Sequence, residues 1–116
     1  MKIHVKRVYA PPAKTDGLRV LVDRLWPRGL SKEAARIDIW AKGIAPSHEL
    51  RRWFHSQEGN FTEFRKRYRK ELGENEQEAR ALREQIGRRK ATLLYASKAD
   101  EHNHAQLLRE FLERLD

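Results

Sequence analysis

Short apolar stretches near the two ends of the chain predict β-strands. Residues 3–9 alternate weakly between polar and apolar positions and are rich in β-forming residues. They end before two prolines, at positions 11 and 12, which lack the N–H group that a sheet needs. Residues 19–25 predict a second strand, and residues 91–96 (ATLLYA) form the continuous apolar run that is typical of a strand buried on both faces. Isolated isoleucines in residues 31–45 indicate a short strand or an irregular segment.

Caps and apolar spacing predict helices between these strands. Ser47 follows a proline and is expected to cap a helix with Glu49 in its first turn, where the carboxylate complements the helix dipole. The next helix has one apolar face at helical spacing, which consists of Phe61, Phe64, Tyr68 and Leu72.

Two further helices are predicted before and after the buried strand. Asn75, with Glu78 three residues later, resembles a capping box, and Gly87 is expected to end that helix. The closing helix is expected to begin near Asp100. Its predicted buried face consists of Ala105, Leu108, Phe111, Leu112 and Leu115.

This order of elements predicts an α/β fold. Strands that are separated by long helical crossovers favour parallel pairing. We therefore expect a small, partly parallel sheet of three to four strands flanked by four helices. The length of 116 residues, without a linker rich in Pro, Gly or Ser, predicts that residues 1–116 form a single domain.

Composition narrows the cellular setting. Cysteine is absent, which excludes disulfides, thiol catalysis and cysteine-based zinc sites and suits a reducing cytoplasm. No apolar stretch approaches the roughly 20 residues of a membrane span, and the start of the chain (MKIHVKRVYA) lacks the apolar segment of a signal peptide. We therefore expect a cytoplasmic protein without a membrane partner.

The charge balance is strongly basic, with 25 Lys and Arg against 17 Asp and Glu and a net charge of +8. The basic excess is larger in residues 1–60 than in the rest of the chain. Such a field favours anionic partners, namely nucleic acid, phosphorylated metabolites or acidic lipid surfaces. The alternative is that the charge serves solubility alone.

Polar side chains follow the second strand and the buried strand, at the ends where open α/β sheets bind their ligands. If the two strands are parallel neighbours, these groups face one another across one edge of the sheet. The candidate ligand-binding residues are Arg24, Trp26, Arg28, Tyr95, Ser97, Lys98 and Asn103, and the candidate catalytic residues are Asp23, Arg28 and His102.

The first of these clusters is expected to present a guanidinium group. The WPRG stretch at residues 26–29 suits a type I turn, with Pro second and Gly fourth, and this turn would point Arg28 outward. Asp23, paired with Arg24 or Arg28, would orient a guanidinium for bidentate contact with phosphate or carboxylate. The alternative is a buried Asp–Arg pair that only locks the loop, with Trp26 as a lid on the core.

The second cluster lies at the start of the closing helix. The free N–H groups and the dipole of a helix N-terminus attract anions, and Lys98 directly precedes this one. Asp100 is expected to cap the helix, which places Asn103 at the third helical position, where it could turn toward the site. His102 and His104 would lie about 200° apart on the helix, so they cannot share a metal ion. No HExxH or Cys/His spacing occurs, and we predict no metal and no cofactor.

The chain also contains five sequence blocks at characteristic spacing. They are VLVDRLWPRGLSKE, the Asp38–Trp40 motif, APSHELRRWF, EFRKRYRKEL and TLLYASKADEHNHA. Together they resemble the YeaO-like family, a domain-of-unknown-function family of bacteria, in order and over nearly the whole chain. The resemblance implies a small α/β protein, some of whose members are labelled DNA-binding or regulatory, and it implies no particular reaction. Its signature block would consist of Asp23, Arg24, Trp26, Pro27, Arg28 and Gly29, with Tyr95 and Asn103 in the C-terminal block.

These observations predict an electropositive pocket at the carboxyl edge of the sheet that binds a small phosphorylated or nucleotide-like anion. The protein would act there as a binding protein or as an enzyme with Asp23 or a histidine as general base. The alternative is a nucleic-acid-binding or regulatory module that uses basic helices at Arg51-Arg52 and Arg65–Lys70. That binding is expected to be weak and non-specific, because the Phe and Tyr residues of those helices face the core and offer no stacking surface. A structural or interaction protein is the third alternative.

Overall fold

A four-stranded parallel sheet forms the centre of the computed structural model, which describes residues 2–98 and 103–115. The strand order is β1-β4-β2-β3, and every neighbouring pair is parallel. The strands are β1 (Ile3–Arg7), β2 (Leu18–Leu21), β3 (Ile39–Trp40) and β4 (Ala91–Tyr95). The last strand in the sequence therefore lies between the first two, which makes β2 and β4 parallel neighbours and brings their carboxyl ends together.

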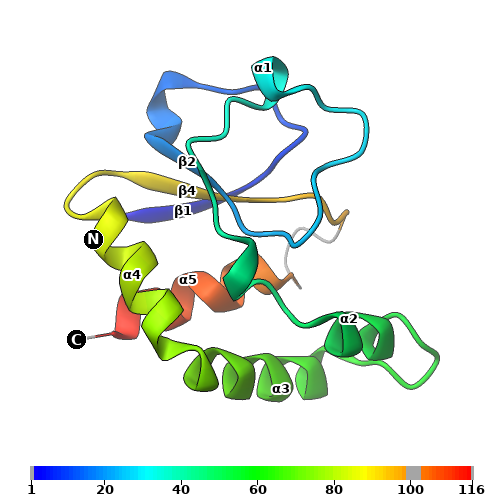
Figure 1. Ribbon diagram of the computed structural model, residues 1–116. Coiled ribbons are helices and arrows are strands. Elements are labelled where there is room, and N and C mark those ends of the chain that lie inside the picture. The colour runs from blue at the N-terminus through cyan, green and yellow to red at the C-terminus, as the bar shows by residue number, and fades with distance from the viewer. Residues whose placement is uncertain (1, 99–102, 116) are drawn as a thin grey trace.

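The longer helices lie on one side of this sheet, and loops that include the short helix α1 (Lys32–Ala35) cover the other (Figure 1). α5 packs directly against β1 and β4, and α3 and α4 pack against α5. The helices are α1 (Lys32–Ala35), α2 (His48–Phe54), α3 (Phe61–Glu74), α4 (Glu76–Ile86) and α5 (His104–Arg114), with 3-10 turns at Lys14–Asp16 and Lys42–Ile44. No helix in the described ranges is long and apolar enough to cross a bilayer.

The predicted α/β class is confirmed, with a sheet that is parallel throughout. The short helix α1 was not predicted, because its four residues carry no apolar repeat. The Ser31 side chain accepts a hydrogen bond from Ala34 N–H and so begins this single turn.

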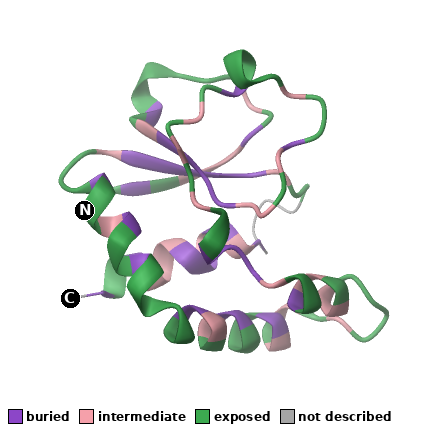
Figure 2. Ribbon diagram, viewed as in Figure 1, coloured by how far each residue is buried: buried purple, intermediate pink, exposed green. Residues whose placement is uncertain are grey.

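Two apolar clusters hold the layers together. The larger lies between the sheet and the helices, and a smaller one around Val8, Leu21 and Leu94 lies on the other face, beneath the loops that carry Trp26 and Leu30. All five residues of β4 are buried, as Figure 2 shows by colour. This confirms the prediction of a strand buried on both faces.

The predicted cap residues of α2 and α4 lie at the ends of their helices, but not all of them make the predicted capping hydrogen bond. The Ser47 hydroxyl accepts a hydrogen bond from Leu50 N–H, which confirms the predicted cap of α2. Asn75 precedes α4 as predicted, but its side chain makes no capping hydrogen bond. Its backbone N–H donates to Glu71 O, so the same residue ends α3 and starts α4. Gly87 ends α4 as predicted.

An ion pair that the sequence did not reveal is buried at the amino edge of the sheet. The Asp16 carboxylate accepts hydrogen bonds from Arg19 Nη1 at 2.6 Å, Lys6 Nζ at 3.0 Å and Ala13 N at 3.0 Å. Arg19 also donates twice to Ala35 O, at 3.0 and 2.8 Å. Burial acts to raise the pKa of the Asp16 carboxyl, but these hydrogen bonds outweigh burial and hold that pKa below its usual value.

Candidate functional site

The loops that follow β1, β2 and β4 meet at the carboxyl edge of the sheet. Tyr9 Oη donates to Arg28 O at 2.8 Å, which joins the loop after β1 to the loop after β2. Arg7 Nε donates to Ser97 O at 3.1 Å, which joins the end of β1 to the loop after β4. The two polar clusters predicted from the sequence therefore lie on loops that are both hydrogen-bonded to β1 or to the loop that follows it.

Asp23 separates the ends of β2 and β4. The ladder between them continues as far as the hydrogen bond from Val22 N to Leu94 O at 3.0 Å. In a parallel pair the next bond would run from Ala96 N–H to Val22 O. Here Ala96 N–H donates to Asp23 Oδ2 at 2.9 Å instead. The carboxylate thus takes the place of a backbone acceptor, and this explains why β2 ends at Leu21, four residues before the predicted end.

His104, the first residue of α5, completes this arrangement. Its Nε2 lies 3.1 Å from Val22 O, the carbonyl that the ladder releases, and 2.8 Å from Asp23 Oδ1. The ring nitrogen thus lies within hydrogen-bonding distance of both oxygens, and the described residues offer no other partner to the buried Asp23 Oδ1. Both side chains are largely buried, with 15% of His104 and 17% of Asp23 exposed.

The predicted ion pair between Asp23 and Arg24 or Arg28 is wrong. Arg24 reaches the segment before α2, where its Nη2 donates to Ala45 O at 3.0 Å and its Nε to Pro46 O at 3.4 Å. These carbonyls satisfy the guanidinium, and the ionisable partner of Asp23 in the described structure is His104.

Two tryptophans hold the loop after β2 in place. Trp26 Nε1 donates to Leu30 O at 2.6 Å, and Trp40 Nε1 donates to Asp23 O at 2.8 Å. Their rings meet edge to face with centroids 5.5 Å apart. Trp26 also packs against the smaller apolar cluster, in agreement with its alternative role as a lid on the core.

The turn that presents Arg28 begins one residue later than predicted. Leu30 N–H donates to Pro27 O, so Arg28 and Gly29 occupy the two central positions. Gly29 has a φ of 82°, which suits the third position of a type II turn, where residues other than glycine are strained. The predicted type I turn over residues 26–29 is therefore wrong, although Arg28 is exposed as expected.

The closing helix also begins later than predicted. Asn103 is the cap of α5, since its Oδ1 accepts from Gln106 N–H at 3.1 Å, and it does not occupy the third helical position. Asp100 and His102 lie outside the described residues. Tyr95 is buried at the end of β4, and Ser97 and Lys98 are exposed in the loop that follows.

A buried tyrosine lies beneath His104. Tyr68 Oη donates to Ile44 O at 2.8 Å, and its ring lies edge to face with the His104 ring, 6.3 Å between centroids. Burial, together with the charges of Glu71 and Asp23, strongly raises the pKa of the Tyr68 hydroxyl. Tyr68 therefore stays protonated at neutral pH and acts as a fixed hydrogen-bond donor.

The chemistry available at this edge is that of a positioned carboxylate, an imidazole and two exposed cations. The Asp23 carboxylate is paired with His104, and the exposed Arg28 and Lys98 side chains have no partner in the part of the chain that the structure describes. No group of three metal-ligating side chains occurs among the described residues. His104 was missing from the predicted site, and the signal was its position directly after the capping Asn103.

The basic helices proposed as an alternative nucleic-acid surface are partly neutralised. Arg67 pairs with Glu63 at 3.0 Å and lies 3.9 Å above the Trp53 ring, and Arg69 pairs with Glu110 at 3.3 Å. The cations of α3 that remain exposed without an ion pair in the described structure are Arg65, Lys66 and Lys70.

Comparisons with known proteins return relatives along nearly the full length. Residues 2–115 match a family model described as the inactive DUF488-N3 subclade. The chain is 44% identical over 115 residues to the uncharacterized protein YeaO of Escherichia coli, covering 99% of the chain and 100% of that protein. It is 42% identical over 111 residues to the uncharacterized proteins Mb3100c of Mycobacterium bovis and Rv3073c of Mycobacterium tuberculosis, covering 96% of the chain and 93% of each. No solved structure gives a significant match.

Proposed function

Because the chain belongs to the YeaO-like family, within the inactive DUF488-N3 subclade, we propose that it binds a small phosphorylated or nucleotide-like anion at the carboxyl edge of the sheet and does not convert it. The description of the subclade as inactive favours binding over catalysis. The absence of cysteine suits a reducing cytoplasm, where we place this activity.

The observation that carries this proposal is the pair of unmatched cations on loops that meet. Arg28 follows β2 and Lys98 follows β4, and these strands are parallel neighbours. Hydrogen bonds through Arg7 and Tyr9 tie the two loops together. A guanidinium and an ammonium group beyond the carboxyl ends of adjacent parallel strands suit a phosphate group.

Asp23 adds a negative charge next to these cations. Its Oδ1 is buried and lies 2.8 Å from His104 Nε2, so a ligand would meet a carboxylate that is already paired with an imidazole. A carboxylate repels a bare phosphate, so this pair favours a ligand with a hydroxyl or amino group next to its phosphate, as in a nucleotide.

The hydrogen bonds of neighbouring side chains support a non-catalytic role. Arg24, Trp26 and Trp40 each donate to backbone carbonyls, and so they hold the loop rather than a ligand. Tyr68 is buried and protonated. If the protein were an enzyme, the remaining ionisable side chains for catalysis would be the paired Asp23 and His104.

Ligand-dependent thermal stability tests the proposal. A nucleoside phosphate should raise the melting temperature more than sulfate at equal ionic strength, because a ligand that binds only the folded state stabilises it. Arg28→Ala and Lys98→Ala should each reduce this increase, while the unliganded stability changes by less than about 0.5 kcal/mol, as at most exposed positions. Arg65→Ala, which removes an exposed arginine from α3, is the matched control and should leave the increase unchanged.

Three outcomes would contradict this function. The first is an unchanged melting temperature with millimolar nucleotides, and the second is a large loss of unliganded stability in Arg28→Ala. The third is turnover of a nucleotide that Asp23→Asn abolishes, which would favour the enzymatic alternative. Weak nucleic-acid binding through Arg65 and Lys66, which are exposed and unpaired within the described residues, is the alternative from a different class.

A further inference from the structure

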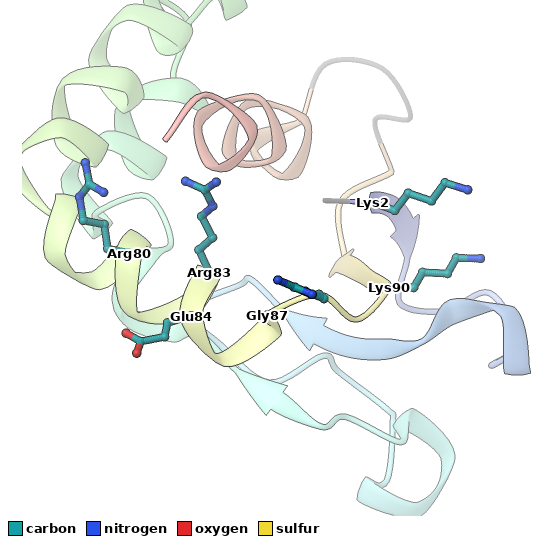
Figure 3. Close-up of a pocket in the computed structure, with 7 residues that line it drawn as sticks. Lys2, Arg80, Arg83, Glu84, Gly87 and Lys90 are labelled. Atoms are coloured by element: carbon teal, nitrogen blue, oxygen red, sulfur yellow. The ribbon is translucent and has the colours of Figure 1, made fainter. Parts of the chain in front are cut away.

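A second group of cations lines a cleft at the opposite, amino edge of the sheet (Figure 3). The cleft has a volume of about 820 Å³. Its lining consists of Lys2, Arg80, Arg83, Glu84, Gly87, Arg88 and Lys90. Five of these side chains are basic and one is acidic, so the cleft has a strong net positive charge.

The fold brings these cations together from three segments. Lys2 and Lys90 directly precede β1 and β4, which pair in parallel with Ile3 opposite Ala91. Figure 3 shows their side chains extending in the same direction. Arg80 and Arg83 lie on adjacent turns of α4 and extend side by side, whereas the Glu84 carboxylate is turned away from them.

Several of these cations have no partner among residues 2–98 and 103–115. Arg80 pairs with Glu76 at 2.9 Å, and Arg83 donates to Leu115 O. In contrast, the described residues offer no hydrogen bond or ion pair to the side chains of Lys2, Arg88 and Lys90. Unmatched like charges in one cleft repel each other, and a bound anion relieves that repulsion.

A simpler explanation would be that the cations complement the negative end of the α4 dipole. Arg89 already has this role. Its Nη2 donates to Gln85 O at 2.5 Å and its Nε to Ile86 O at 3.3 Å, and these are carbonyls of the last turn of α4. Arg88 and Lys90 are therefore not required to complete the helix.

The lining also defines the class of ligand. It includes no aromatic and no aliphatic side chain, so the cleft offers no aromatic ring on which a base could stack, and charge dominates its recognition. Its volume lies within the roughly 300–1,000 Å³ of small-molecule sites. We propose that this cleft binds a small polyanion of the oligophosphate class, with two or more linked phosphate groups, at a site separate from the one at the carboxyl edge.

Calorimetric titration with pyrophosphate and tripolyphosphate at constant ionic strength tests this proposal. Both should bind, and tripolyphosphate should bind more tightly than orthophosphate. The double variant Arg88→Glu/Lys90→Glu should weaken tripolyphosphate binding at least about tenfold, because it places repelling charges in the cleft. Arg65→Glu/Lys66→Glu changes the net charge equally on the exposed face of α3 and should alter the affinity less than about twofold.

A neutral pair, Arg88→Gln/Lys90→Gln, keeps the test valid if charge reversal impairs folding, and it should weaken binding in the same direction. Equal losses in the α3 control would overturn the proposal, since they would indicate a response to net charge alone. Loss of tripolyphosphate binding in Arg28→Ala/Lys98→Ala, with binding kept in the Arg88 and Lys90 variants, would also overturn it. If duplex DNA bound this cleft more tightly than tripolyphosphate does, the ligand of the cleft would be nucleic acid and the proposal of a small polyanion would be wrong.

Discussion

Charged residues have two different roles in this protein. Asp16 and Arg19 are buried, and each carries several hydrogen bonds, so their charges are matched within the fold. Arg28, Lys98 and Arg88 are exposed, and no described residue pairs with their side chains. Charges of the first kind contribute to stability, and charges of the second kind are available to ligands.

The Asp16–Arg19 pair makes a specific contribution to the pH dependence of stability. The pKa of the Asp16 carboxyl is lower in the folded protein than in the unfolded chain, where it is about 3.9. The pair therefore stabilises the fold fully above that pH, and this stabilisation is lost as the pH falls through the lower folded pKa. Asp16→Asn should cost about 3–5 kcal/mol at pH 7, because it leaves Arg19 buried without a counter-charge. Urea unfolding from pH 7 to pH 2.5 should show this difference shrinking below about pH 4.

The matched control is Glu63→Gln, which breaks the exposed pair with Arg67. Its free energy of unfolding should change by no more than about 0.5 kcal/mol at any pH. A loss in Asp16→Asn that stays constant down to pH 2.5 would show that the charge of Asp16 is not what stabilises the fold.

At the level of the secondary-structure elements, two glycines differ in whether their surroundings leave room for a side chain. Gly17 precedes β2 with a φ of 65°, and a Cβ atom there would lie 2.3 Å from Lys90 O. That carbonyl accepts a hydrogen bond from Leu18 N–H at 2.9 Å, so it cannot move without breaking the start of β2. Gly73 lies inside α3, and a Cβ atom there would meet no atom within 4 Å.

Alanine substitutions should therefore change the stability of the two elements in opposite directions. Gly17→Ala should destabilise the protein by about 3 kcal/mol or more, through backbone strain and the clash with Lys90 O. Gly73→Ala should stabilise it by about 0.5 kcal/mol, because alanine loses less backbone entropy in a helix. Thermal unfolding of both variants measures the difference. A neutral Gly17→Ala would show that the junction between Lys90 and β2 is not rigid.

Most helices and strands could be predicted from the sequence, but several of their exact ends could not. Strands β1, β2 and β4 and helices α2 to α5 follow from apolar spacing and local caps, such as Ser47, and these were predicted with errors at their ends. The pattern around β3 fits a short strand and an irregular segment equally. Several of the errors at strand ends share one cause, since contacts between distant residues set these ends. Asp23 lies 73 residues from Ala96, and Asp16 lies 76 residues from Thr92, whose Oγ1 donates to the Asp16 carbonyl. No local pattern reveals which carboxylate will replace a ladder carbonyl or pair with a buried arginine.

The same limit applies to the candidate site. The sequence placed the polar ends of β2 and β4 at one edge on the condition that the strands are parallel neighbours, and the structure meets that condition. The partner of Asp23 depended on where α5 starts, and the start of α5 depended on Asn103 acting as its cap. The cleft at the amino edge combines Lys2, Arg83 and Lys90 from distant segments, and the local signal was the basic run at residues 88–90.

For the whole molecule, the net charge of +8 is divided among separate surfaces. Arg28 and Lys98 lie at the carboxyl edge, Arg88 and Lys90 at the amino edge, and Arg65 with its neighbours on α3. A basic surface binds duplex DNA strongly only when many cations contact successive phosphates. The division of charge over opposite edges therefore favours small anions over a continuous nucleic-acid path.

Duplex DNA should accordingly bind weakly and with a shallow dependence on salt. At physiological salt we expect a Kd of about 1–100 µM, the range of non-specific binding. The logarithm of the affinity falls against the logarithm of salt with a slope of about −0.9 for each neutralised phosphate, so a slope of only about −2 to −3 is expected. Fluorescence anisotropy at four or five salt concentrations, with wild type and Arg65→Glu/Lys66→Glu, measures both quantities. Sub-micromolar binding with a steep slope that this variant abolishes would identify α3 as a nucleic-acid surface, because the dispersed cations at the two edges of the sheet cannot produce that result.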